Sequence, residues 1–248
     1  MRVLRVVGKT LPEAWENAVA DLWFQGDEVE TEYGERAKEV MAVVEVIEPF
    51  AEPRVHVKGI VGKLSDYVAE VVEGVHDDKV ELYGYTYHER LFSYKLPTGE
   101  VYNQIQRIAE KLRAAPYTRR AVAVTWQPWK DPESKYPPCL VYTWFHCADG
   151  EKLEMHVHMR SNDALKASFM NMYAFTLLLK HVAESSGLKV GKYVHVADNF
   201  HVYERDWKHA EYLAHAVKQG VSGKWHITTE KYLAIFERST ITTAPRNP

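Results

Sequence analysis

One of the two cysteines in this chain stands where its thiol could act as a nucleophile. Cys139 follows Tyr136-Pro137-Pro138 and precedes an apolar run that begins at Leu140. Prolines cannot sit inside a regular strand ladder, so the pair predicts a rigid turn that leads into a strand. A thiol at such a junction can face a cleft, where its thiolate would attack an electrophilic carbon. The alternative is that Cys139 is a small buried hydrophobic residue, which is the common fate of a free cysteine.

Three arginines stand at the ends of predicted elements, where their guanidinium groups could bind a phosphate. Arg119-Arg120 precedes a predicted strand, and Arg160 ends another strand directly before Ser161 and Asn162. We expect Ser161 or Asn162 to cap a long helix, whose N-terminal dipole would favour an anion beside Arg160. The alternatives that need no ligand are a solvated arginine pair and plain helix capping.

Polar side chains further along the chain suit a base and a sugar. Asn171 lies in the predicted long helix among large apolar residues, and a buried amide must find hydrogen-bond partners. It is either a satisfied core residue or a group that reads a donor and an acceptor on a base edge. His201 and Tyr203 share one face at the end of a predicted strand and could hold a sugar hydroxyl. Otherwise they are two ordinary edge residues.

A histidine cluster supports a competing hypothesis. His156 and His158 share one face of a predicted strand, and His146 lies on the preceding strand. A His-x-His pair on a strand holds iron or zinc in some β-barrel enzymes. Because no further ligands stand at a recognisable spacing, we expect a solvated polar face and no metal.

The elements that must position these side chains follow from capping signals and apolar periodicity. Thr10-Leu11-Pro12-Glu13 is a capping box with proline at the first helical position. We predict helices over residues 11–24, 65–73, 102–114, 162–187 and 206–218, and strands over 2–7, 41–47, 121–126, 140–147, 153–159 and 194–203. Because strands and helices do not alternate strictly, we expect an α+β fold, with a mixed β-sheet layered with helices.

Composition limits the classes of protein that remain. The 248 residues are 46% hydrophobic and 26% charged, with a formal net charge of −3. Without a linker or a repeat, one domain over residues 1–248 is expected. A general nucleic-acid binder carries a basic excess, so nucleic acid is disfavoured as a partner. No apolar run suits a signal peptide or a membrane span, and two cysteines are typical of a cytoplasmic protein with free thiols.

The order of these motifs along the chain resembles that of the thymidylate synthase family. Tyr136-Pro137-Pro138-Cys139-Leu140 is similar to the nucleophile motif of the family, in which His usually follows the cysteine. The other similar segments, in chain order, are Tyr87-His88-Glu89-Arg90, Asn103-Gln104-Ile105, Thr118-Arg119-Arg120-Ala121, Thr125-Trp126-Gln127-Pro128, Arg160-Ser161-Asn162-Asp163, Asn171, Gly187-Leu188-Lys189-Val190-Gly191 and His201-Val202-Tyr203. The resemblance covers roughly residues 83 to 207.

The N-terminal third departs from the family pattern. Gly34-Glu35-Arg36-Ala37 stands where the family has an Arg-Thr-Gly-Thr loop. Residues 68–74 replace the Glu-Leu-Leu-Trp-Phe-Leu helix, which supplies the catalytic glutamate and a tryptophan that stacks on the pterin. Glu70 and Glu73 are the candidates for that glutamate. The chain is most similar to the short archaeal-type branch, which is related to the pyrimidine nucleotide hydroxymethylases.

The resemblance implies a methyltransferase that converts dUMP to dTMP through a covalent bond between Cys139 and uracil C6. The cosubstrate would be 5,10-methylenetetrahydrofolate or methylene-tetrahydromethanopterin, without a metal. The enzyme would be a homodimer, in which Arg119 and Arg120 reach the phosphate in the partner's site. The alternatives are a 5-hydroxymethylase acting on dUMP, dCMP or CMP and a non-catalytic nucleotide-binding protein, against which the retained Cys139 argues.

The resemblance also implies a role for each further site residue. Arg160 would activate the thiol and bind phosphate, and Asn171 would pair with uracil O4 and N3–H. Asparagine favours uracil, because hydroxymethylases acting on cytidylate often carry aspartate there. The remaining implied roles are phosphate binding by Arg36 and Ser161, ribose binding by His201 and Tyr203, a pterin hydrogen bond from Asp163, ordering of a water by Tyr87, and polarisation of the C4 oxygen through water by Glu70.

Overall fold

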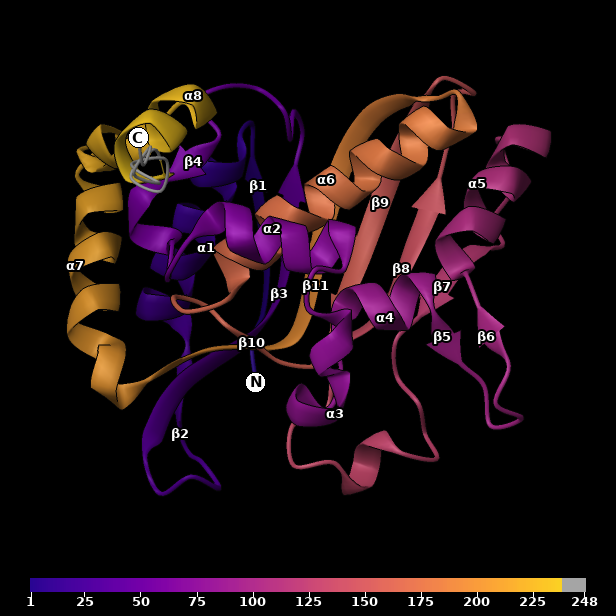
Figure 1. The fold of residues 1–248 in the computed structure, drawn as a ribbon. Coiled ribbons are helices and arrows are strands. Elements are labelled where there is room, and N and C mark those ends of the chain that lie inside the picture. Colours follow the sequence, from indigo (N-terminus) through magenta and orange to yellow (C-terminus); the bar gives the residue numbers. More distant parts are fainter. Residues whose placement is uncertain (238–248) are drawn as a thin grey trace, which may run out of the picture.

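The computed structural model describes residues 1–237 and centres on a mixed eight-stranded sheet (Figure 1). Neighbouring strands run antiparallel, except that β1–β3, β9–β11 and β10–β11 run parallel. In sheet order the main strands are β1 (Val3–Gly8), β3 (Arg36–Val46), β11 (Lys189–Tyr203), β9 (Lys152–Met159), β8 (Leu140–His146) and β7 (Ala121–Val124), while β2 (Asp27–Glu30) pairs with β3 and β10 (Asn162–Asp163) with β11. The predicted α+β class with a mixed sheet is confirmed.

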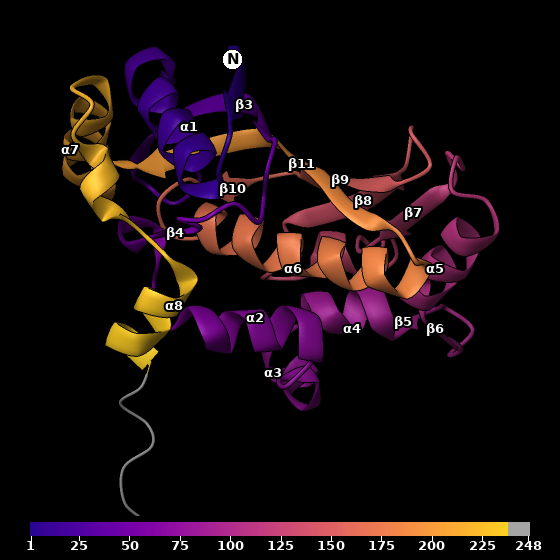
Figure 2. The same ribbon diagram turned by 90° about the horizontal axis from the view of Figure 1, so that it is seen from above.

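Helices cover one side of this sheet. In Figure 2, α6 lies along the sheet, and α2 and α4 lie beyond α6. The helices are α1 (Leu11–Gln25), α2 (Leu64–Glu73), α3 (Val80–Tyr83), α4 (Tyr87–Phe92), α5 (Gln104–Ala114), α6 (Ser168–Ser186), α7 (Trp207–Lys218) and α8 (Thr229–Tyr232). Two small ladders join β4 (Val55–His56) to β12 (His226–Ile227) and β5 (Tyr94–Lys95) to β6 (Val101–Tyr102). No helix within residues 1–237 is long and apolar enough to cross a membrane.

Local sequence signals explain several of these elements. Thr10 caps α1 as predicted, because its hydroxyl accepts from the backbone N–H of Glu13, whose carboxylate accepts from that of Thr10. Strand β9 alternates as predicted: its apolar residues pack under the helices and its polar residues face the other way. Helix α6 ends before Gly187, whose φ of 76° is the left-handed conformation that glycine adopts most readily.

The predicted start of the long helix at Asn162 is wrong. Asn162 and Asp163 form the short strand β10, which pairs in parallel with Phe200 and His201 of β11. The carboxylate of Asp163 then accepts hydrogen bonds from the backbone N–H groups of the next turn, and α6 begins only at Ser168. Ser161 and Asn162 are therefore not helix caps, and the N-terminus of α6 does not directly follow Arg160.

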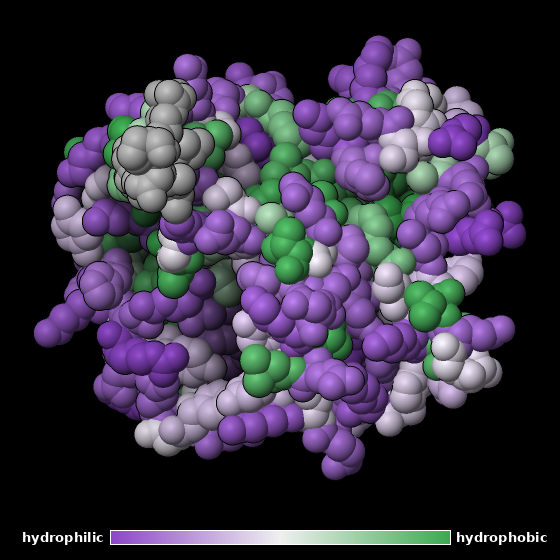
Figure 3. Space-filling view, viewed as in Figure 1, coloured by the Kyte–Doolittle hydropathy of each residue, from purple (hydrophilic) through white to green (hydrophobic). Residues whose placement is uncertain are grey.

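The two sides of the sheet differ in their surface. The side seen in Figure 3 carries the helices and is mostly hydrophilic, with apolar patches in the region of α2 and α6. In Figure 2, no helix of the described residues covers the opposite side of β7, β8 and β9. That side exposes Val122 (44%), Val124 (41%) and Tyr142 (36%). An uncovered face with apolar side chains is typical of a surface that binds another protein.

Candidate active site

Cys139 lies directly before β8, beside the end of the neighbouring strand β9. The backbone N–H of Arg160 donates to the Cys139 carbonyl oxygen at 2.9 Å. The guanidinium of Arg160 donates to the carbonyl oxygens of Pro138 and Pro137, both at 3.0 Å. The same guanidinium places Nη2 3.9 Å from the Cys139 sulfur. The two prolines and Arg160 therefore hold the thiol and its cationic neighbour in one arrangement.

The environment of the thiol has two opposing effects on its acidity. Burial raises the pKa of the Cys139 thiol, and the positive charge of Arg160 acts in the opposite direction. The net result is a raised pKa, so the protein without ligands holds the thiol mostly protonated at neutral pH. A reaction at Cys139 must therefore remove this proton, and Arg160 is the nearby cation that would stabilise the thiolate.

A cavity of about 320 Å³ beside Arg160 is lined by four of the residues predicted for the site. Ser161 follows Arg160, and His201 and Tyr203 come from the end of β11 with their rings 4.7 Å apart. Burial lowers the pKa of His201, so its imidazole is neutral at pH 7. The other wall is the hairpin between β2 and β3, including Tyr33. Glu30, Glu32 and Glu39 also line the cavity, so it is a polar pocket in which Arg160 is the one cation among the lining residues.

Asp163 lies on β10, opposite His201 in the parallel register. Its carboxylate accepts from the backbone N–H groups of Leu165 at 3.0 Å and Lys166 at 2.8 Å. Burial raises the pKa of Asp163, and these N–H groups and His201 act against that rise. The side chain thus holds the turn that enters α6, in addition to any ligand it binds.

Asn171 and Tyr87 lie on the helical side of the site. Asn171 is 4% exposed on α6, and its carbonyl oxygen Oδ1 accepts a hydrogen bond from the hydroxyl of Tyr67 on α2. The Tyr87 hydroxyl accepts from the backbone N–H of Leu140 at 3.3 Å, so it lies one residue from the nucleophile candidate. Burial raises the pKa of Tyr87 well above its usual value, which keeps the phenol protonated.

Sequence reasoning missed Tyr67. The signal that could have found it is helical spacing, because Tyr67 and Val71 are four residues apart on α2 and Val71 is fully buried. That spacing turns Tyr67 toward α6, while the predicted glutamate is engaged elsewhere. Glu70 pairs with His76, with 2.9 Å between Oε2 and Nδ1, and the other candidate, Glu73, is exposed.

The remaining predicted phosphate ligands lie outside this cavity. Arg36 forms ion pairs with Glu204 at 2.6 Å and Glu28 at 3.5 Å. Arg119 and Arg120 are exposed just before β7, and the backbone carbonyl of Arg119 accepts from the Trp144 indole on the uncovered side of the sheet. The structure therefore brings Arg160, but not these three arginines, to the Cys139 pocket of the same chain.

The strand histidines do not converge on one point. His158 bonds Asp198 at 2.9 Å, while His146 stacks on Trp144 and His156 meets the same indole edge-on. Within residues 1–237, the one group of three side chains whose ligand atoms lie within 4.8 Å of one another is Glu16, His56 and His226. The metal-site hypothesis for the strand histidines has no geometric support.

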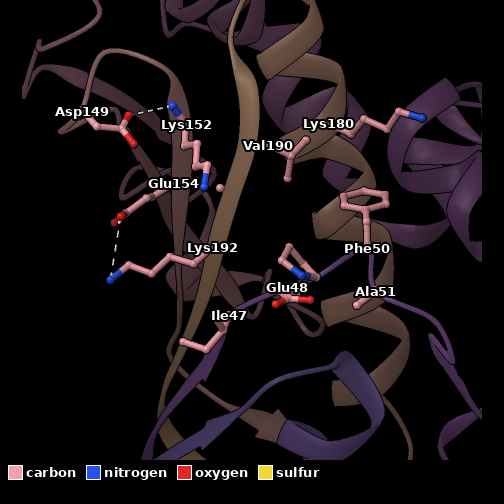
Figure 4. A pocket seen from close by; sticks show the side chains of 12 residues that line it. Ile47, Glu48, Phe50, Ala51, Asp149, Lys152, Glu154, Lys180, Val190 and Lys192 are labelled. Carbon is pink, nitrogen blue, oxygen red and sulfur yellow. Dashed lines mark hydrogen bonds and ion pairs between the residues drawn. The ribbon is translucent and has the colours of Figure 1, made fainter.

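A larger cavity, of about 630 Å³, lies at the opposite ends of β9 and β11 (Figure 4). One pair of its charged side chains is joined: Figure 4 shows Lys192 turned toward Glu154, with 3.8 Å between Nζ and Oε1. It contains none of the predicted site residues. The chemistry of the lining, rather than the volume, favours the cavity at Arg160 as the candidate active site.

Comparison with known proteins gives a consistent result. The family model "Thymidylate synthase" matches residues 16–240. A protein of Methanopyrus kandleri named "Putative thymidylate synthase" is 34% identical over 83% of this chain and 95% of its own length. Proteins of the same name from Methanosarcina mazei and Methanocaldococcus jannaschii are 31% and 33% identical, over 87% and 80% of this chain and over 96% and 90% of their own lengths.

Proposed function

The chain belongs to the thymidylate synthase family, and from this premise we propose that it methylates C5 of dUMP to give dTMP. The family uses a folate-type cosubstrate, and in this proposal the donor is 5,10-methylenetetrahydrofolate or methylene-tetrahydromethanopterin. The observation that carries the proposal is the thiol of Cys139 held 3.9 Å from the guanidinium of Arg160, beside a polar cavity.

The chemistry explains why a thiol and a cation belong together here. Uracil C5 is a weak nucleophile, and addition of the Cys139 thiolate at C6 moves the electron pair of the C5–C6 double bond onto C5 and O4. C5 can then bond to the one-carbon unit and lose its proton, the bond between that carbon and the pterin nitrogen breaks, and, once hydride or water has added to the carbon, the bond between sulfur and C6 breaks. The reduced pterin supplies the carbon and, for methylation, a hydride by which it is itself oxidised.

Each predicted residue has a task in this proposal. Arg160 stabilises the thiolate and, with Ser161, binds the phosphate, while Asn171 reads the uracil edge. His201 and Tyr203 hold the ribose hydroxyl from the end of β11. Four further tasks are proposed on the family resemblance. Asp163 hydrogen-bonds the pterin, Tyr87 orders a water molecule, and Glu70 polarises the C4 oxygen through water. Arg36 binds the phosphate, for which it would first have to break its ion pair with Glu204.

We further propose that the enzyme is a cytoplasmic homodimer that pairs the uncovered sides of two sheets. Arg119 and Arg120 border that side and lie outside the cavity of their own chain, and in this proposal they bind the phosphate in the partner's site. The Nε2 atom of His156 is buried there without a hydrogen bond in residues 1–237, and Oε2 of Glu154 lies 3.8 Å from it. Burial of Val122, Val124 and Tyr142 against a second copy would remove exposed apolar area from water.

The test is the mass of the product after incubation with dUMP, dCMP or CMP and each methylene donor. We expect dUMP to gain the elements of CH2, with oxidation of the pterin. A gain of CH2O would show a hydroxymethylase instead, since water then replaces hydride. Binding of nucleotide without any product in the presence of either donor would support a non-catalytic protein.

A further inference from the structure

We propose that Tyr67 sets the base preference of this site by holding the Asn171 amide in the orientation that accepts uracil and rejects cytosine. The inference rests on the proposed function, because it concerns which pyrimidine nucleotide that same site takes. Tyr67 acts through Asn171, so it is a positioning residue.

The contact joins two helices that the fold brings together. Tyr67 stands on α2, and its hydroxyl reaches Oδ1 of Asn171, which is 4% exposed on α6. Helices α2 and α6 pack against each other, and the Val61 backbone N–H just before α2 also donates to the Met170 sulfur at 3.3 Å. The packing of α2 on α6 and the contact between Val61 and Met170 therefore hold the Tyr67 hydroxyl at the Asn171 amide.

The chemistry of the two groups decides the direction of the bond. A carbonyl oxygen can only accept, so the Tyr67 phenol must donate to Oδ1. Burial, with smaller effects of Tyr85, Glu70 and Cys139, raises the pKa of Tyr67 well above 10.0, so this donor persists at neutral pH. If the amide were rotated by half a turn, Nδ2 could donate to the phenol oxygen, but the phenol proton would then need another acceptor.

The fixed amide leaves a defined pattern for a ligand. Oδ1 has a second lone pair, and no group in residues 1–237 accepts a hydrogen bond from Nδ2 of Asn171. A donor from Nδ2 matches uracil O4, and the lone pair matches uracil N3–H. Cytosine presents an amine and a bare N3 at the same places, so donor would face donor and acceptor would face acceptor.

The test compares Tyr67→Phe with the wild type for kcat/KM on dUMP and dCMP, together with the dissociation constants of both nucleotides. Tyr232→Phe is the matched control, because the Tyr232 hydroxyl accepts from the Leu64 backbone N–H at 3.4 Å and so touches the same helix away from Asn171. Melting temperatures of all three proteins show whether each variant is folded.

We expect Tyr67→Phe to narrow the ratio of dUMP to dCMP by about tenfold, the effect of one lost orienting hydrogen bond. Tyr232→Phe should keep the wild-type ratio. If it loosens α2, it should lower kcat/KM for dUMP and for dCMP by the same factor. A wild type that prefers dUMP while Tyr67→Phe keeps its ratio would overturn the inference and leave the proposed function standing. An equal change of the ratio in both variants would also overturn it. A wild type that binds and converts neither nucleotide would overturn the proposed function, and this inference with it.

Discussion

Two of the groups of buried polar side chains in residues 1–237 differ in how fully their polar atoms are paired. In one, Glu16 accepts hydrogen bonds from His226 at 2.8 Å, Ser222 at 2.9 Å and His56 at 3.2 Å. In the other, within residues 1–237, the polar contact of the Cys139 thiol is the guanidinium at 3.9 Å, and nothing accepts from Nδ2 of Asn171. The first group is closed and holds elements together, while the second leaves polar atoms for a ligand.

The closed group shows why convergence of ligand-type side chains is not enough for a metal site. Nδ1 of His56 accepts the Lys58 backbone N–H at 3.2 Å, so the neutral ring carries its proton on Nε2 and donates it to Glu16. A metal at Nε2 would have to displace that proton and break the Lys58 bond. These side chains instead join α1 to β4 and β12, which come from distant parts of the sequence.

The largest effect is expected from a change of the Cys139 thiol. Cys139→Ser should lower turnover by on the order of 10⁴-fold or more, because a serine hydroxyl is not ionised at neutral pH, while dUMP binding survives. Cys147→Ala is the control, since Cys147 is fully buried beside Asp149 and outside the cavity. Steady-state rates and dUMP titrations measure both effects. Equal loss of turnover in the two variants would remove Cys139 from the mechanism.

The next largest effect tests the proposed sharing of sites between subunits. Cys139→Ala and Arg120→Ala should each be inactive as pure dimers. In a mixed dimer one of the two sites has both its cysteine and its arginine intact, so random exchange should restore about a quarter of wild-type activity. Subunit exchange is verified with two differently tagged chains. Verified exchange without recovered activity would contradict the shared site.

A smaller effect is expected when Asn171, which faces the edge of the base in this proposal, is changed. Asn171→Asp removes the donor to uracil O4 and places a carboxylate against a carbonyl oxygen, whereas the same carboxylate accepts from the cytosine amine. An unmet buried hydrogen bond costs about 1–3 kcal/mol, so the preference for dUMP over dCMP should shrink by roughly one to two powers of ten. The measurement is kcat/KM for both nucleotides with both proteins. A wild type that already prefers the cytidine nucleotide would make the hydroxymethylase the leading hypothesis.

A structural feature could be predicted from the sequence where the residues that determine it lie within one short segment. The capping box at Thr10, the alternation of β9 and the end of α6 at Gly187 are local signals, and all three are confirmed. The start of α6 was predicted wrongly, because Asn162 and Asp163 pair with β11, about forty residues later in the chain. Pairing between strands so far apart in the sequence leaves no local pattern in the two short segments that pair.

The same distinction holds in the candidate site. Arg160 and Cys139 lie on neighbouring strand ends, and their motifs were recognisable as short segments. The contact of Tyr67 with Asn171 depends on how α2 packs on α6, and the pairing of Glu70 with His76 depends on the turn after α2. Such contacts follow from helix packing, which neither composition nor spacing within one segment specifies.

The smallest effect on turnover is expected at the closed group, where the cost should appear in stability instead. Three hydrogen bonds and the charge of His226 outweigh burial and lower the pKa of Glu16 to about 2 from 4.5. A lowered carboxyl pKa stabilises the fold above pH 4.5, and that stability is lost as the pH falls toward 2. Burial also lowers the pKa of His56, so as the pH falls this histidine is protonated in the unfolded chain before it is protonated in the folded protein. Acidification therefore destabilises the fold through His56 as well as through Glu16.

Glu16→Gln should therefore cost about 2–3 kcal/mol of stability at pH 7 and remove most of the acid dependence of stability between pH 4.5 and 2. It should leave kcat/KM of the folded protein near the wild-type value. Urea unfolding at several pH values measures this, with Glu110→Gln as an exposed control that should not change stability measurably. Unchanged stability in Glu16→Gln, or a changed ratio of dUMP to dCMP, would show that this group is not the purely structural counterpart of the Cys139 site.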